Sequence, residues 1–270
     1  MKIKYLAGLV VTALMFGSCE SLDYVPGDQM SGQTFWQTED HARQAAVGMY
    51  AAMKADWCFG LEFTFDMCSD LADGTTPWSD ISRGTSFASN SGGVQNHWQY
   101  LYELVHRTNT VIRNVKGMPI SQETIDKVTG EAKFLRAMAY FRMLNCWGGV
   151  PYYDENCDIN EQFAKLNAPR STPDEIRGHI IADLTEAIEK LPVSWDAADL
   201  GRATKGAAYA LRGKVYLFNR QWTEAIADFE EIVYNKANNY GYALHPDYNE
   251  LFRLYNGNHS PEMIFFHSVN

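Results

Sequence analysis

The sequence predicts a mainly α-helical fold with long loops and little β-structure. Apolar residues recur at helical spacing over several long stretches of the chain, and residues typical of caps and turns separate those stretches. Residues 204–237 also match a tetratricopeptide-type helix hairpin of 34 residues in the types and spacing of their side chains. Because one such repeat cannot bury its own faces, we expect other helix hairpins to stack on it.

The first half of the chain predicts two helices with an irregular segment between them. We expect Thr38 to cap the first helix, because acidic residues follow it in the first turn. Periodicity disappears between about residues 66 and 93, where Asp, Gly, Ser and Thr dominate. Since long ordered loops in compact domains are usually functional, we expect this loop to carry function. A long helix follows from Gln95 and stops at residues 117–119.

The second half predicts further helices and one β-type run. A helical stretch covers residues 121–146, with Gly130 as a weak point. Thr172 and Glu175 form a capping box for the next helix. The final segment, residues 262–269, has the apolar character of a strand. The sequence stops inside this run, so we expect the chain to be truncated at its C-terminus.

Three residues carry the interpretation of the 34-residue unit. Gly213 lets two antiparallel helices approach closely, Tyr216 packs across the pair, and Ala225 is small where the next helix crosses. Arg212 and Ala237 replace the usual Leu and Pro, so the unit is a degenerate repeat. We still expect a helix hairpin here.

The N-terminus reads as a lipoprotein signal. Residues 1–18 combine a basic start, a short apolar run and small residues before Cys19, an order that resembles a lipobox. The run is shorter than the ~20 apolar residues of a membrane-spanning helix. We predict that Cys19 is lipidated and that residues 19–35 form a flexible tether. A plain secretory signal with an incidental cysteine is the alternative.

The mature chain is acidic. Cleavage before Cys19 removes two lysines and no acidic residue, so the formal charge goes from −10 to −12. Nucleic acids and anionic lipid surfaces bind clustered Lys and Arg, so the charge argues against both as partners. It is compatible with a neutral sugar as the ligand.

The sequence contains no motif for catalysis or for a cofactor. There is no Gly-x-Ser-x-Gly elbow, no His-Glu-x-x-His and no phosphate-binding loop, and the histidines are scattered. The absence of a Cys-x-x-Cys pair argues against zinc. We therefore expect no enzymatic activity, no cofactor and no metal site. Four further cysteines are compatible with disulfides or with free thiols: Cys58, Cys68, Cys146 and Cys157.

Several stretches, taken in order, are similar to the SusD/RagB family. No single stretch is specific, but their order and spacing together are. They are the lipobox with its acidic tail, residues 97–102 and 107–109, residues 131–141, residues 148–151, residues 202–208 and residues 261–265. The resemblance identifies residues 36–270 as the N-terminal helical domain of a SusD-like fold.

The resemblance implies a lipoprotein on the outer face of the outer membrane. Such a protein captures starch or another polysaccharide or oligosaccharide, without enzymatic activity, and delivers it to a SusC-like TonB-dependent transporter. Its tetratricopeptide-type helices contact that transporter, and family members are about twice this length. The alternative is a peptide-binding or purely protein-binding lipoprotein of the same transport system. Exposed aromatic rings beside polar groups would favour a glycan, whereas an apolar groove with basic residues would favour a peptide.

Four residues of the aperiodic loop are candidates for ligand binding: Asp73, Trp78, Asp80 and Arg83. Sugars are recognised when an aromatic ring covers their apolar C–H faces and polar side chains bind their hydroxyl groups. The loop offers both kinds of side chain within a few residues. The alternative is that Trp78 packs beneath the loop and that the charged residues are solvated.

Other aromatic and charged residues are predicted to be structural. Helical spacing places Trp98 and Tyr102 on the apolar face of their helix, so we predict that both belong to the core. Arg136 lies in a dense apolar stretch, and we expect a structural arginine whose hydrogen bonds are satisfied within the protein.

Overall fold

The computed structural model describes residues 32–60, 62–74, 79–85, 92–157, 168–234, 239–251, 253 and 260–266. The chain divides into two compact units, Met1–Trp36 and Gln37–Asn270. In the first unit the structure describes the short helix α2 (Gly32–Phe35). The predicted signal peptide and Cys19 lie outside the described residues. No helix in the described part of the chain is both long enough and apolar enough to cross a membrane.

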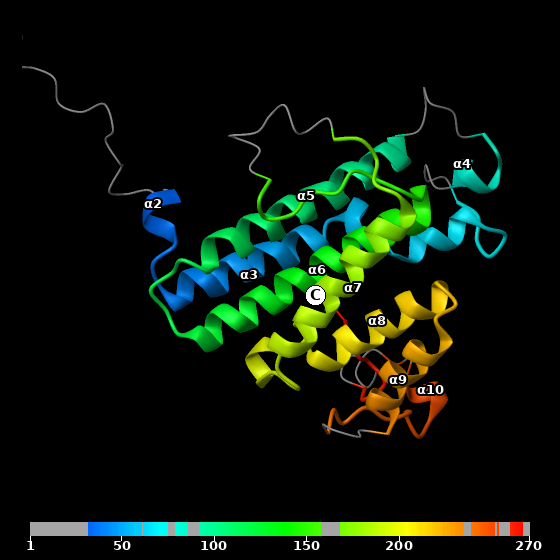
Figure 1. Cartoon of the computed structure of the whole chain (residues 1–270). Coiled ribbons are helices and arrows are strands. Elements are labelled where there is room, and N and C mark those ends of the chain that lie inside the picture. Colours follow the sequence, from blue (N-terminus) through cyan, green and yellow to red (C-terminus); the bar gives the residue numbers. More distant parts are fainter. Residues whose placement is uncertain are drawn as a thin grey trace, which may run out of the picture. The chain divides into compact units, whose positions relative to one another are not determined.

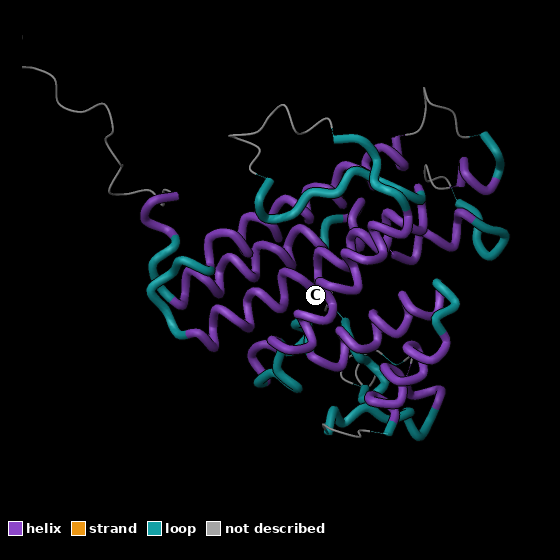
Figure 2. The backbone as a smooth tube through the Cα atoms, in the orientation of Figure 1, coloured by secondary structure: helices purple, strands orange, loops and turns teal. Residues whose placement is uncertain are grey.

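The second unit is helical, which confirms the predicted fold class, and its described residues contain no strand. Figures 1 and 2 show this arrangement. The long helices are α3 (Glu39–Met53), α5 (Gly92–Val115), α6 (Gln122–Trp147), α7 (Pro173–Lys190), α8 (Lys205–Phe218) and α9 (Trp222–Val233). The short ones are a π-helical turn (Asp56–Gly60), a 3₁₀ helix (Glu62–Cys68), α4 (Ser79–Ser82), a 3₁₀ turn (Ala197–Asp199) and α10 (Tyr248–Leu251).

Helix α6 forms the centre of the second unit. It packs against α3, α5 and α7, while α7 also packs against α8, and α8 against α9. In Figure 1, α3, α5 and α6 lie side by side. Every residue from Val128 to Ala137 is buried, including the charged Glu131, Lys133 and Arg136. Because buried charges are costly unless they are paired, these three side chains need partners on the surrounding helices.

The predicted helix caps are confirmed. The Thr38 hydroxyl accepts a hydrogen bond from the His41 amide at 3.2 Å. The Glu175 amide donates to the Thr172 hydroxyl at 3.3 Å, and the Thr172 amide donates to the Glu175 carboxylate at 2.7 Å. These bonds satisfy amide groups that have no partner inside the first helical turn. Helix α5 begins at Gly92, slightly before the predicted start at Gln95.

Helices α8 and α9 form the hairpin expected within residues 204–237, and Ala225 is buried there. A Cβ atom placed on Gly213 would lie 2.7 Å from the Phe229 ring of α9, which confirms the close approach. Arg212 binds both carboxylate oxygens of Asp228 on α9 at 2.8 and 2.7 Å. At the position where the repeat usually has leucine, Arg212 therefore forms an ion pair across the hairpin.

Two sequence predictions about the second half are wrong in the described residues. Gly130 is no weak point, because α6 is continuous through it and an added Cβ would lie 3.0 Å from Leu191 Cγ. Residues 262–266 contain the end of a turn and a bend instead of a strand. No neighbouring strand is described that could pair with them, and Phe265 packs edge-on against Phe134 of α6, with 5.0 Å between ring centroids. Position 237 of the repeat lies outside the described residues.

We expect Gly213→Ala to destabilise the chain by about 1–3 kcal/mol, because the added methyl group overlaps the Phe229 ring. Gly178 is the matched control, since it is an exposed glycine within α7 and an added Cβ would meet nothing within 4 Å. Gly178→Ala should be neutral or stabilising by up to ~1 kcal/mol. Urea unfolding followed by circular dichroism measures both, and equal effects would contradict the close-approach interpretation.

Candidate functional site

A cavity of about 510 Å³ runs along α5 and is closed on its other side by the segment that follows α6. We call it the α5 groove. It is lined by aromatic rings and by side-chain amides together. The lining residues are Gln95, Trp98, Gln99, Tyr102, Val105, His106, Asn109, Pro151, Tyr153 and Cys157. This combination of rings and amides is the one that we expect for sugar recognition.

The prediction that Trp98 and Tyr102 are core residues is wrong, because both are half-buried and line the groove. Their ring centroids lie 5.0 Å apart, and Trp98 also packs edge-on against Trp147. The Tyr102 hydroxyl donates to the Pro151 carbonyl at 2.7 Å. Burial raises the pKa of Tyr102, so its hydroxyl stays neutral and remains a donor. Helical periodicity identifies their face correctly but does not reveal that a loop covers it.

The second wall of the groove is residues 150–157, which we call the wall segment. The Asn109 side-chain amide donates to the Tyr153 carbonyl at 2.9 Å. The Tyr153 amide donates to the Tyr140 hydroxyl at 2.7 Å. Arg113 donates to the Glu155 carbonyl at 2.9 Å. Side chains of α5 and α6 therefore hold the backbone of this segment in place, although it has no regular secondary structure.

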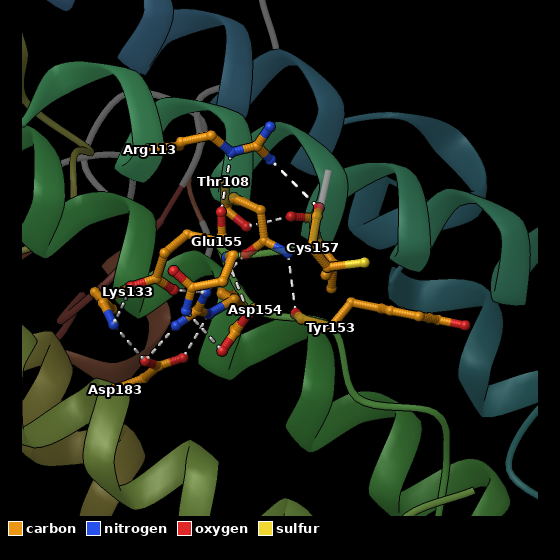
Figure 3. A network of polar contacts seen from close by, with 12 residues as sticks. Thr108, Arg113, Lys133, Tyr153, Asp154, Glu155, Cys157 and Asp183 are labelled. Atoms are coloured by element: carbon orange, nitrogen blue, oxygen red, sulfur yellow. Dashed lines mark hydrogen bonds and ion pairs between the residues drawn. The ribbon is translucent and has the colours of Figure 1, made fainter. Parts of the chain in front are cut away.

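A buried cluster of charges lies beneath the wall segment, and Figure 3 shows it around Lys133, Glu155 and Asp183. Arg136 of α6 is 1% exposed and binds both carboxylate oxygens of Asp183 on α7 at 2.7 Å. The same guanidinium donates to Asn109 of α5 and to Glu155 of the wall segment, each at 2.7 Å. We call this the Arg136 cluster. It confirms that Arg136 is a structural arginine with satisfied hydrogen bonds.

The charge state of Glu155 follows from the same cluster. Burial disfavours its carboxylate, but the hydrogen bond and the positive charge of Arg136 outweigh burial and lower the pKa of Glu155 to about 2. A carboxyl group with a lowered pKa stabilises the fold above its unfolded pKa, near 4.3. This contribution is lost as the pH falls towards 2, so the Glu155 pairing is complete at neutral pH.

The structure brings only some of the sequence-predicted site residues together. Asp73 and Arg83 form an exposed ion pair, and Arg83 also donates to the Gly74 carbonyl at 3.1 Å. Both line an open hollow of about 560 Å³, whose lining does not include Asp80. Asp80 instead accepts from the Thr85 amide through its backbone carbonyl at 2.9 Å. Trp78 lies outside the described residues. Ligand binding by these four residues stays a prediction.

A third cavity, of about 690 Å³, is lined mainly by phenylalanine and methionine, and we call it the phenylalanine cavity. Two cations, Arg142 and Lys214, also line it. The Arg142 guanidinium lies 4.2 Å from the ring centroid of Phe65 and 5.1 Å from that of Phe59. The other lining residues are Met53, Met138, Phe141, Asn145, Cys146, Leu211, Phe218 and Phe265.

The described residues bring no three His, Cys, Asp or Glu side chains together as a metal site. None of the four cysteines whose pairing the sequence leaves open forms a disulfide in the described structure. They do not share one environment, because Cys58 is buried, Cys146 is exposed, and Cys157 lines the α5 groove.

Comparisons with known proteins identify the family. The model of the SusD-like family described as "Starch-binding associating with outer membrane" matches residues 22–217. The chain belongs to this family. The SusD-like protein P25 of Formosa agariphila is 28% identical over 247 residues, which are 86% of this chain and 46% of that protein. The match confirms the resemblance that the sequence motifs indicate.

Solved SusD-like structures share the fold. A SusD-like protein of Bacteroides fragilis has a TM-score of 0.72 at 26% identity, over 92% of this chain and 48% of that one. A laminarin-binding SusD-like protein has a TM-score of 0.70 at 27% identity, over 80% of this chain and 48% of that one. The chain therefore spans about half the length of the SusD-like relatives that it matches.

We expect Arg136→Met to destabilise the chain by about 3–5 kcal/mol, because it leaves the buried Asp183 and the half-buried Glu155 without their main partner. The control is Arg107→Met, which removes an exposed pair with Glu103 of similar length, 2.8 Å, and should cost less than about 1 kcal/mol. Chemical denaturation at pH 7 compares the two. Similar costs would show that the cluster does not hold the fold together.

Proposed function

We propose that this chain is the glycan-binding N-terminal part of a surface lipoprotein that captures starch or a related polysaccharide and performs no chemistry on it. The α5 groove carries the proposal, because it places three aromatic rings and several side-chain amides in one cavity. The family description and the laminarin-binding relative support a glycan as the ligand. The chain spans about half the length of those relatives, so glycan capture by the whole protein belongs to the proposal.

The chemistry of the groove suits a neutral sugar chain. The rings of Trp98, Tyr102 and Tyr153 offer apolar surface to the C–H faces of glucose units. The amides of Gln95 and Gln99 both donate and accept hydrogen bonds, as sugar hydroxyl groups require. No carboxylate and no Lys or Arg is among the described lining residues. A neutral lining of this kind favours uncharged polysaccharides over sulfated or uronic acid polymers.

The proposal includes the membrane anchor and the transporter. We assign the lipid to Cys19, and we assign delivery to a SusC-like TonB-dependent transporter in the outer membrane. An apolar stripe on α9 supports a protein contact, because Trp222, Ile226 and Val233 share one helix face and are each more than half exposed. Exposed apolar surface of this kind is typical of interaction sites. The family match ends at residue 217, before this helix.

Peptide binding is the second candidate function, and the phenylalanine cavity favours it. Its lining is apolar and carries the two cations Arg142 and Lys214, which is the pattern expected for a peptide with acidic and apolar side chains. Glycan and peptide capture would therefore use different cavities, and substitutions can separate them. Arg142→Glu should abolish peptide binding and leave glycan binding unchanged.

We expect Trp98→Ala to weaken binding of soluble starch or laminarin by about tenfold or more, because it removes the largest ring of the groove. Affinity gel electrophoresis and calorimetry on the mature chain measure the effect. Trp222→Ala is the matched control, since Trp222 is exposed on α9 and does not line the groove. Trp78→Ala, measured in parallel, tests glycan binding by the predicted 66–93 loop.

Loss of binding in Trp98→Ala alone would assign the glycan to the α5 groove, and loss in Trp78→Ala alone would assign it to the 66–93 loop. If the folded wild type binds none of a panel of polysaccharides, glycan capture by this chain is contradicted. Binding of acidic peptides that is lost in Arg142→Glu would then establish the second candidate.

We expect the double substitution Trp222→Glu and Ile226→Glu to abolish co-purification with the SusC-like transporter and to leave glycan affinity unchanged, because it places charge on the apolar stripe. Thr223→Glu with Ala227→Glu adds the same charge at the same spacing, on exposed positions of α9 outside the stripe. Retention of the transporter by the first variant would contradict the assigned surface.

A further inference from the structure

Besides the ion pair of Glu155, the wall segment is held at five residues through its backbone. Side chains or backbone groups from outside it bind the carbonyl oxygens of Val150, Pro151, Tyr153, Glu155 and Cys157. A loop without secondary structure normally samples many conformations, and ordering it on ligand binding would cost affinity. Here the backbone bonds impose one conformation before any ligand arrives.

Tyr140 makes the most complete of these contacts. Its hydroxyl accepts from the Tyr153 amide at 2.7 Å and donates to the Tyr153 carbonyl at 3.2 Å. A single hydroxyl thus satisfies both backbone groups of one residue, which uses its one donor and one of its two acceptor sites. Tyr140 is 1% exposed and is not among the residues that line the α5 groove. Its hydroxyl therefore acts on the groove through Tyr153, while its ring packs against Tyr102.

Two features keep this contact in one arrangement. Burial raises the pKa of Tyr140 well above its usual value, so the hydroxyl stays protonated at any physiological pH. The Tyr153 carbonyl also accepts from Asn109, whose own side-chain oxygen accepts from Arg136 at 2.7 Å. Because Arg136 has donors only, this bond fixes which end of the Asn109 amide faces Tyr153. The Arg136 cluster and Tyr140 thus act on the same peptide group.

We propose that Tyr140 is a positioning residue for glycan binding, which presets the ring of Tyr153 as the second wall of the α5 groove. The inference rests on the proposed function for its ligand and on the hydrogen bonds of Tyr140 for its mechanism. According to this proposal, a buried hydroxyl that does not line the groove changes the affinity for the glycan.

Tyr50 provides a matched control within the same chain. Its hydroxyl accepts from the Ala203 amide at 2.8 Å and donates to the Glu131 carboxylate at 2.8 Å. It thus anchors the backbone of another loop by the same kind of bond, and it lines neither the α5 groove nor the phenylalanine cavity. Loss of either hydroxyl leaves a backbone amide without its partner, and Tyr50→Phe also removes a bond to the buried Glu131 carboxylate, so it should lose at least as much stability as Tyr140→Phe.

The test compares Tyr140→Phe, Tyr50→Phe and wild type in the mature chain. The phenyl ring keeps the contacts of Tyr140 with the rings of Tyr102 and Tyr152. We expect Tyr140→Phe to bind laminarin and soluble starch about three- to tenfold more weakly, because the wall segment must then be ordered on binding. Tyr50→Phe should bind both as tightly as wild type, with a decrease in Tm at least as large as that of Tyr140→Phe.

Hydrogen–deuterium exchange without ligand tests the mechanism separately. We expect faster exchange in peptides covering residues 150–157 for Tyr140→Phe, and in peptides covering residues 199–203 for Tyr50→Phe. Unchanged exchange at 150–157, or equal affinity losses in both variants, would overturn the positioning role. If wild type binds neither polysaccharide, the proposed function is wrong, and so is the role of Tyr140 in ligand binding. Faster exchange at residues 150–157 in Tyr140→Phe would then still show that Tyr140 orders the wall segment.

Discussion

The fold depends on one constraint, which is that the guanidinium of Arg136 is buried at the centre of a helical unit. A buried cation is tolerated only when anionic and polar groups surround it. Those groups come from α7, from α5 and from the wall segment, in the form of Asp183, Asn109 and Glu155. Helices that adjoin α6 must therefore meet it in one register, because a shifted helix would leave a charge unpaired.

A second polar cluster, five residues before Arg136 in the middle of α6, holds this helix to α3 and to Arg202 in the same manner. Glu131 is fully buried and accepts two hydrogen bonds from Arg202, at 2.7 and 2.6 Å, as well as one from Tyr50. Burial raises the pKa of Glu131, and Arg202 opposes that rise. The central helix is thus fixed by charge pairing at Glu131 and at Arg136, which have different partners.

The sequence predicts a structural feature correctly where the residues that determine it lie close together in the chain. The caps at Thr38 and Thr172 and the close approach at Gly213 are predictable because the partners are nearby in the chain or belong to a known repeat. The prediction is wrong for Trp98 and Tyr102, because the wall segment, some fifty positions later in the chain, determines whether these side chains are buried in the core or line a cavity. For the same reason the sequence predicts that Arg136 is satisfied but does not name its partners.

Main-chain hydrogen bonds hold the wall segment in place, whereas side chains of the same segment line the groove and would contact the ligand. The bonds at residues 151, 153 and 155 involve main-chain oxygen or nitrogen, so they do not depend on which side chains stand at positions 153 and 157. Residues at these positions can be exchanged while the scaffold keeps its shape. The segment is therefore a natural place to retune ligand preference, by selection or by design, without rebuilding the helices beneath it.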